Sequence, residues 1–561
     1  MHYVTILSFY SHFISIMKTF IFSFFIFALV SCSKDANKET NQVDYKNHEP
    51  QSFVKAAHYF ANSWAKTFWE EFEERQVDKD MKQIKSDGFN TVILVVPWVG
   101  FEENFQNKAT TSSPEMYRRL GFMLNAIKHN KLNYMLRLGY PHSFTPNAGT
   151  TLIDVCTNIY ERPQQKEKWI QYLNNIKRTV EEYSSNSVGT LVSWEDFWCP
   201  HFVFPGLSEL RRKELAKNMG YAQWVMKKDL TLLKVLYGKN NLTIEDIAVP
   251  KKDEMSYFYY IEFIDDRFRE IILNSTKSIF PDTAMEIRID KDPVKSSSGE
   301  YIWVEHDLYF DEENHKGTYW APFWGAENKG EKLDVNTALF NFEYFLNYIT
   351  NNGQATNHII EQFNFKDNTP GFSHNAILIE NQVDEFLLKS TALLKKYSQG
   401  YGIWTYHDYA DNGLYNSSFE LGLKGWKHSN VGIIGDQRDQ QIQMQPKGWI
   451  SQTYNAFNRF LSPNSYKTLQ LCINTSKEGE VGVYSNELLV AKINLSLGEK
   501  CYPIAAENLT QVENTFKIVA ISAVIIDELK LYGFVQKLGL YDEHGKELEH
   551  IESIRLMNKA L

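Results

Sequence analysis

The stretch Thr91-Val-Ile-Leu-Val-Val-Pro-Trp98 is the clearest indication of the fold in this sequence of 561 residues. Its unbroken apolar run, rich in β-branched residues, predicts a strand over Asn90–Trp98 that is buried on both faces. A helix is predicted before it at Lys79–Ser86, and Gly88 ends that helix. A second helix is predicted after it at Glu115–His129. Helices on both sides of a buried strand favour a parallel sheet.

The same alternation continues in both directions. The predicted strands are Val54–Trp64, Asn90–Trp98, Leu132–Tyr140, Val188–Trp194, Ala284–Ile289, Tyr301–Val304, Ile359–Ile360 and Gly402–Trp404. Further helices are predicted at Glu167–Tyr183, 210–279, Val335–Thr350 and Asp384–Tyr397. About eight strand–helix units predict an α/β fold, a closed (β/α)₈ TIM barrel, over residues 52–412. A doubly wound open sheet is the alternative, but no Gly-rich phosphate loop follows the first strand.

The sequence pattern changes after Asn412. Residues 413–537 contain short strand-like runs with turns between them and hardly any helical periodicity. This pattern predicts an all-β sandwich. Residues 538–561 are charged and are interpreted as a C-terminal tail without predicted structure.

The N-terminus has the features of an export signal. From Met17, a lysine is followed by a short apolar run that ends at Leu29-Val-Ser-Cys32. Residues 1–16 are interpreted as an upstream misassigned start, 1–32 as ending in a lipoprotein signal peptide, and the polar stretch 33–51 as a flexible tether. The last four residues resemble the bacterial lipobox, which implies lipidation of Cys32 and a cell-envelope location, at the outer membrane, periplasmic or surface-exposed. An uncleaved anchor formed by residues 4–30 is the alternative.

Composition narrows the function classes. The formal charge of −10 argues against a nucleic-acid partner. The 14% aromatic content suits either a large core or surfaces that stack on sugars. Cys472 and Cys501 form a disulfide or remain free buried thiols, and no Cys-x-x-Cys pair indicates a metal site. No cofactor is expected, and the oligomeric state stays open.

Two glutamates end apolar runs and are the candidate catalytic residues. They are Glu195, in Leu191-Val-Ser-Trp-Glu-Asp-Phe-Trp198, and Glu361, in His358-Ile-Ile-Glu-Gln-Phe363. A carboxylate at the end of a buried strand is costly without a role or a partner. Sugar hydrolysis needs two carboxyl groups, one as acid and one as nucleophile or base.

The order of these glutamates resembles that of the clan A glycoside hydrolases. In that clan the acid/base glutamate ends the fourth barrel strand and the nucleophile ends the seventh, which implies these roles for Glu195 and Glu361 and a retaining mechanism. Gly402-Ile-Trp404-Thr-Tyr406 resembles the strand-eight segment whose Trp floors the sugar subsite. The candidate substrate-binding residues lie in or just after predicted strands, and they are Trp404, Trp194, Trp98, Trp303, Trp320, Trp324, Arg137, His142, His306, Tyr309 and Tyr406.

Trp194 is a departure from the clan, which usually has Asn before the acid/base glutamate. Asp196, directly after Glu195, is a competing candidate for the acid. Two rival hypotheses follow: a non-catalytic surface glycan-binding lipoprotein on a decayed barrel, and an envelope enzyme whose transglycosylation outcompetes hydrolysis. The start of the last domain, Asn416-Ser-Ser-Phe-Glu-Leu-Gly-Leu-Lys-Gly-Trp426, resembles that of carbohydrate-binding β-sandwiches, and also that of sandwiches that only brace an enzyme.

Overall fold

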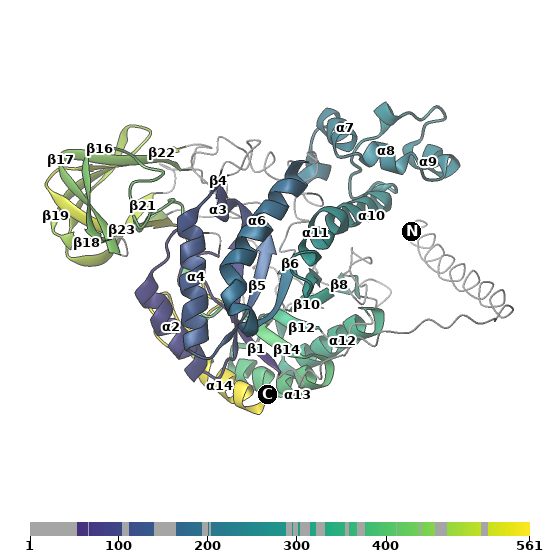
Figure 1. Ribbon diagram of the computed structural model, residues 1–561, viewed down its shortest axis with the longest axis horizontal. Helices are drawn as coiled ribbons and strands as arrows, with labels where there is room; N and C mark the ends of the chain where they lie inside the picture. Colours follow the sequence, from purple (N-terminus) through teal and green to yellow (C-terminus); the bar gives the residue numbers. More distant parts are fainter. Residues whose placement is uncertain are drawn as a thin grey trace. The chain divides into compact units, whose positions relative to one another are not determined.

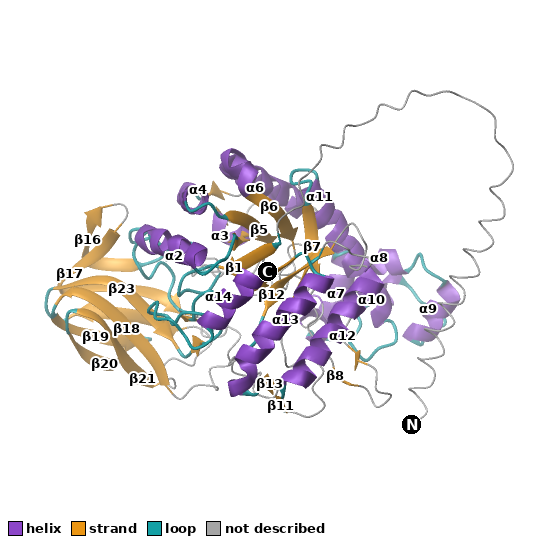
Figure 2. Ribbon diagram, turned by 90° about the horizontal axis from the view of Figure 1, so that it is seen from below, coloured by secondary structure: helices purple, strands orange, loops and turns teal. Residues whose placement is uncertain are grey.

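Eight parallel strands form a closed barrel, as the sequence predicts. The computed structural model describes residues 53–65, 67–103, 111–139, 164–192, 200, 203–287, 294–295, 301–302, 315–320, 331–353, 358–366, 376–410, 412–436, 439–454, 468–505 and 514–561. In chain order the barrel strands are β1 (Val54–His58), β2 (Thr91–Pro97), β5 (Asn133–Gly139), β6 (Ser187–Val192), β7 (Thr283–Ile287), β10 (His315–Trp320), β12 (Ile359–Phe363) and β14 (Gly400–Ile403). Figure 2 shows several of these strands inside a ring of helices.

The strand β2 shows why an apolar run suits the wall of the barrel. All seven of its residues are buried, and it pairs in parallel with β1 on one side and β5 on the other. Ile93 packs with Met135 and Leu191 in the small cluster inside the barrel, whereas Val92 and Leu94 belong to the core under the helices. A strand apolar on both faces therefore suits the barrel wall.

Helices cover the outside of the barrel (Figure 1). They include α2 (Glu74–Ser86), α3 (Trp98–Phe101), α4 (Pro114–His129), α6 (Gln164–Val180), α12 (Val335–Gly353) and α13 (Val383–Tyr397). The predicted helical stretch between the fourth and fifth strands comprises α7 (Glu209–Asn218), α8 (Tyr221–Val225), α9 (Leu230–Tyr237), α10 (Tyr257–Phe268) and α11 (Asn274–Lys277). In α4, Met116, Leu120, Leu124 and Ile127 are buried at helical spacing, and Pro114 suits the first turn.

The prediction of the sixth strand is wrong. Residues 301–302 form β9, which pairs antiparallel with β8 (Val294–Lys295) outside the barrel. The sixth barrel strand is β10, between β7 and β12. Its sequence, His-Lys-Gly-Thr-Tyr-Trp, has too few apolar residues to stand out as a buried strand.

The predicted all-β domain is confirmed. We call residues 413–537 the β domain. Its antiparallel sheet comprises β16 (Lys427–Asp436), β17 (Asp439–Tyr454), β18 (Thr468–Lys477), β19 (Gly479–Ser485), β20 (Leu488–Leu495), β21 (Gly498–Ala505), β22 (Asn514–Ala520) and β23 (Val524–Tyr532). A disulfide joins Cys472 to Cys501 on the paired strands β18 and β21, so the bridged alternative holds.

The last residues return to the barrel instead of forming a tail. Helix α14 (Ile551–Ala560) lies beside α13 (Figures 1 and 2) and supplies the helix that follows the eighth strand. The amide of Asn558 accepts a hydrogen bond from the Tyr401 hydroxyl at 2.7 Å and donates one to the Asp87 carbonyl at 2.9 Å. A Cβ atom at Gly88, whose φ is +85°, would lie 3.0 Å from the Cβ of Asn558, so glycine permits this close approach. The β domain is thus inserted between the last barrel strand and its helix.

Residues 53–561 form one compact unit. The predictions for residues 1–32 and 33–51, including Cys32, lie outside the described residues. Among the described helices, none combines the length and the apolar character that a membrane crossing needs.

Candidate active site

Glu361 lies inside the barrel on β12, the seventh strand, as predicted. Its side chain is fully buried, within a strand whose five residues are all buried. Gly402 on the neighbouring β14 leaves room for this strand, since a Cβ there would come within 2.6 Å of the Glu361 carbonyl oxygen. Glu361 is therefore a carboxylate buried in the barrel wall, and its burial is costly unless other groups compensate its charge.

Arg137 supplies the first partner. Its Nη1 donates to Oε2 of Glu361 at 2.9 Å, and both side chains have no exposed surface. Because β5 and β12 stand on opposite sides of the barrel order, the guanidinium reaches across the interior. An arginine stays protonated in proteins, so this pair stabilises the carboxylate of Glu361 as an anion.

His58, at the end of β1, lies beside both Glu361 and Arg137. Its Nε2 lies 3.2 Å from Oε2 of Glu361 and 3.4 Å from Nη1 of Arg137. Its Nδ1 lies 3.2 Å from the carbonyl oxygen of Ile403. A carbonyl only accepts, so the hydrogen bond assigns a proton to Nδ1 and directs Nε2 at the carboxylate and the guanidinium.

Trp404 follows the eighth strand and packs against His58. The two rings have centroids 4.8 Å apart at 65°, an edge-on arrangement. Phe60 and Trp64 contact the same indole at 5.3 and 6.0 Å, and only 7% of Trp404 is exposed. The peptide bond between Trp404 and Thr405 is cis. Glu361, Arg137, His58 and Trp404 thus form one contiguous group.

Two of the predicted substrate-binding residues make their contacts outside this group. The Tyr406 hydroxyl donates to Asp87 at 2.7 Å under the C-terminal segment, and burial, reinforced by Asp87, raises the pKa of Tyr406 above its usual range. Trp98 is 1% exposed and packs edge-on against Trp169 of α6, with centroids 5.0 Å apart. Both side chains fill the layer between barrel and helices.

The remaining predicted residues lie outside what the structure describes. Strand β6 ends at Val192, so Glu195 follows it three positions later in the sequence. Trp320 is the last residue of β10, and its side chain is not described. The residues outside the described ranges are Glu195, Asp196, Trp194, Trp303, Trp324, His142, His306 and Tyr309.

His58 is the residue of this group that the sequence analysis missed. It ends the apolar run Val54-Lys-Ala-Ala-His58, so the rule applied to Glu361, a polar residue at the carboxyl end of a barrel strand, also selects it. The first strand was predicted to extend to Trp64, so its end at His58 was not recognised.

Possible metal ligands group elsewhere in the described part of the chain. Cys472, Glu499 and Cys501 form one group, in which both cysteines are disulfide-bonded. Glu380, Glu549 and His550 form the other, near the start of α13. Neither group includes a residue of the candidate site.

Comparison with known proteins gives structural neighbours only. No family model and no curated protein matches this chain. The GH5_18 protein of Streptomyces cattleya, solved with GlcNAc, is 13% identical and has a TM-score of 0.41, over 64% of this chain and 72% of that one. An exo-β-1,4-mannosidase of Opitutaceae bacterium strain TAV5 is 13% identical, with a TM-score of 0.36 over 64% and 53% of the two chains. A family 1 β-glucosidase of Thermotoga maritima is 9% identical, with a TM-score of 0.40 over 66% and 90%.

Proposed function

We propose that this protein is a glycoside hydrolase in which Glu361 is the catalytic nucleophile. The observation that carries the proposal is the fully buried Glu361 carboxylate inside the barrel, held by Arg137 at 2.9 Å, with Nε2 of His58 3.2 Å from the same oxygen. Barrel enzymes place their catalytic groups at the carboxyl ends of strands, and carboxylates are the groups that cleave glycosidic bonds. Trp404, on the other side of His58, offers an indole for the apolar face of a sugar ring.

The proposed reaction proceeds in two steps. Glu361 attacks the anomeric carbon, the glycosidic C–O bond breaks, and Glu195 protonates the departing oxygen, with Asp196 as the competing acid. Water then attacks the glycosyl ester, Glu195 takes its proton, and the sugar leaves with its configuration retained. The Arg137 charge stabilises the Glu361 carboxylate as it is released in the second step. This mechanism requires carboxyl groups about 5–5.5 Å apart, against roughly 6.5–9.5 Å for inversion.

The proposal is tested by an activity screen on a broad glycan panel. Hydrolysis should occur with at least one glycan, and NMR of the first product should show the anomeric configuration of the substrate. Binding of a glycan without hydrolysis would favour the non-catalytic alternative, and an inverted product would contradict the role given to Glu361. Transfer of the sugar to an added alcohol, faster than release to water, would indicate a transglycosylase.

Trp404→Ala should damage turnover of the folded protein in addition to its stability. Loss of the stacking surface should lower kcat/KM by roughly 10²-fold in the folded fraction. Trp169, buried in α6 with its Nε1 on Thr276, is the matched control. Trp169→Ala should destabilise by about 3–5 kcal/mol through its cavity, with kcat/KM unchanged. Kinetics and urea unfolding of both variants check this, and a Trp404→Ala protein that keeps full specific activity would rule out the platform.

We also propose that the protein is lipid-anchored in the bacterial cell envelope through Cys32. The disulfide between Cys472 and Cys501 supports export, because such bonds persist in oxidising compartments. Mass spectrometry of the membrane fraction should find a diacyl- or triacyl-modified Cys32 at the mature N-terminus. Cys32→Ala should abolish both the modification and the cleavage. If residues 4–30 instead form an uncleaved anchor, the Cys32→Ala protein should stay bound to the membrane.

A further inference from the structure

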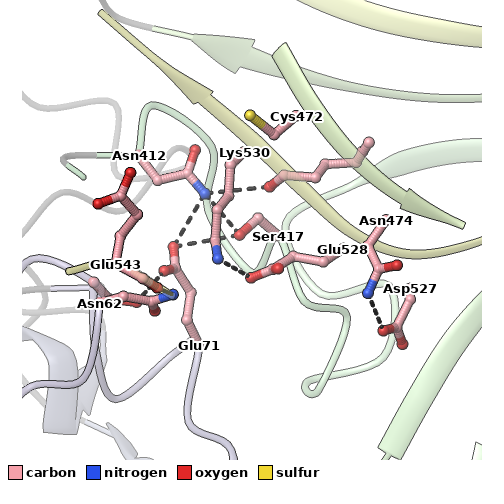
Figure 3. A network of polar contacts seen from close by, with 12 residues as sticks. Asn62, Glu71, Asn412, Ser417, Cys472, Asn474, Asp527, Glu528, Lys530 and Glu543 are labelled. Atoms are coloured by element: carbon pink, nitrogen blue, oxygen red, sulfur yellow. Dashed lines mark hydrogen bonds and ion pairs between the residues drawn. The ribbon is translucent and has the colours of Figure 1, made fainter. Parts of the chain in front are cut away.

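A buried polar cluster joins the β domain to the barrel (Figure 3). Its centre is Glu71, whose side chain is 7% exposed. Oε1 of Glu71 accepts hydrogen bonds from Asn412 Nδ2 at 3.2 Å, directly before the β domain, and from Ser417 Oγ at 3.3 Å, at its start. Oε2 accepts one from Ser63 Oγ at 2.6 Å, on the barrel side. One carboxylate therefore bridges the two parts of the fold.

Asn412 continues the cluster into the β domain. Its Nδ2 also reaches the Ser417 hydroxyl at 2.8 Å, and its Oδ1 accepts the backbone N–H of Leu414 at 3.1 Å and of Leu531 at 2.9 Å. Asn412 thereby ties the linker from the barrel to strand β23. Since the donors and acceptors of this amide are used within the fold, the junction has one favoured geometry.

Charge reinforces the same junction. The Lys530 ammonium forms an ion pair with Glu528 at 2.9 Å, next to Glu71 in Figure 3. Burial lowers the pKa of Lys530, but the carboxylates of Glu528 and Glu71 outweigh it and raise the pKa above its usual range. Lys530 therefore stays charged and attracts Glu71 toward the β domain.

The barrel side of the polar cluster around Glu71 reaches the candidate site. We call residues 59–73, between β1 and α2, the site loop, of which Lys66 lies outside the described residues. Ser63, the barrel-side partner of Glu71, bridges in parallel to Ala410. Its neighbour Trp64 stacks on Tyr409, with centroids 5.2 Å apart at 19°, and contacts Trp404 edge-on. The loop thus runs from His58, beside Glu361, past the indole of Trp404, to Glu71.

Arg119 of α4 makes a second, independent tie. It is 1% exposed, and its Nη1 donates to the carbonyl oxygens of Trp69 and Glu70 in the site loop at 2.7 and 3.1 Å. Its Nη2 donates to the carbonyl oxygen of Glu420 in the β domain at 3.0 Å. The site loop is thus held to the β domain at two points.

We propose that the β domain is a positioning domain for the candidate site, and that Glu71 is the positioning residue through which it holds the site loop against Trp404. The inference rests on the proposed function, since it takes Trp404 to be the sugar platform. It assigns the β domain a role at the reacting end of the barrel that needs no glycan bound to the β domain itself. Insertion before α14 supports it, because the barrel flanks the β domain on both sides in the sequence and the two cannot separate freely.

Kinetics of Glu71 variants provide the first test. With the aryl glycoside that the wild type hydrolyses fastest, Glu71→Ala should lower kcat by between roughly tenfold and 10²-fold, with a smaller change in KM, because the platform is displaced. Glu71→Gln keeps the volume and an acceptor oxygen, so it should restore part of kcat. Asp78→Asn, at an exposed position of α2, is the control and should match the wild type. A Glu71→Ala enzyme with unchanged kcat would overturn the inference.

Hydrogen exchange of the full chain tests the inference without a substrate. Glu71→Ala, or Glu71→Gln where the alanine variant does not fold, should speed amide exchange both in residues 59–65 and in residues 404–410. The Asp78→Asn control should not. Faster exchange confined to residues 67–73 and 412–417 would overturn the proposed link to Trp404. If the wild type hydrolyses no probe, the proposed function fails, and this measurement still decides whether the β domain positions the platform.

Discussion

Glu361→Gln should lower kcat/KM by roughly 10⁴-fold or more while the protein stays folded. The amide keeps the volume of the carboxylate and remains within reach of Arg137 and His58, but it cannot form the glycosyl ester. Glu380→Gln is the matched control, since that carboxylate is 84% exposed at the start of α13, and its kinetics should equal those of the wild type. Circular dichroism of both variants verifies folding.

A chemical rescue distinguishes a nucleophile from an acid. Glu361→Gly in the presence of sodium azide should regain turnover, because azide fits the vacated space and attacks the anomeric carbon directly. The product should be a glycosyl azide of inverted configuration. A retained azide product would instead assign Glu361 the acid/base role, and an undiminished Glu361→Gln enzyme would show that another carboxylate attacks.

Arg137→Leu should produce the largest loss of stability. It leaves the Glu361 charge buried without its guanidinium, which costs about 3–5 kcal/mol in comparable pairs. Arg118→Leu is the control, because Arg118 pairs with Glu74 and Glu115 at the surface with 39% of its side chain exposed. That surface change should cost about 1 kcal/mol or less. Urea unfolding, with the midpoint and the slope compared, measures both.

The double variant Arg137→Leu/Glu361→Leu separates the two causes of this loss. If the uncompensated charge is responsible, the double variant should be more stable than Arg137→Leu alone, since apolar replacements of a buried pair are often neutral. A double variant that is less stable than the single one would show instead that Arg137 acts through packing.

Much of the barrel could be predicted because its strands are apolar on both faces. The apolar run of β2 and the apolar run of β12 that leads to Glu361 can be recognised in the sequence, because a strand buried on both faces needs apolar residues at most positions. The sixth strand could not be found because β10 is polar and short of apolar residues. Helix α14 was missed because its sequence, with a charged residue on most turns, reads as a tail until Tyr401 and Asp87 are placed beside Asn558.

The candidate site was predictable only in part for a similar reason. Glu361, Arg137 and Trp404 follow the rule that function gathers at strand ends, and the structure brings them together. The same rule also selects Tyr406 and Trp98, whose contacts lie outside this group, because an aromatic ring just beyond a strand can turn outward under a helix as readily as inward. The direction depends on partners distant in sequence, such as Asp87 and Trp169, which composition and periodicity do not reveal.

The late position of α14 also affects how the chain folds during synthesis. Every barrel strand leaves the ribosome before the β domain, whereas the helix that covers Tyr401 and Asp87 comes last. The bond from Asn558 to Asp87 spans 471 residues. Between β14 and α14 the ribosome adds roughly 150 residues, which takes about 8–30 s at ordinary elongation rates. During that interval the nascent barrel exposes the surface that α14 covers, so we expect the docking of α14 to be a late, non-local step of folding.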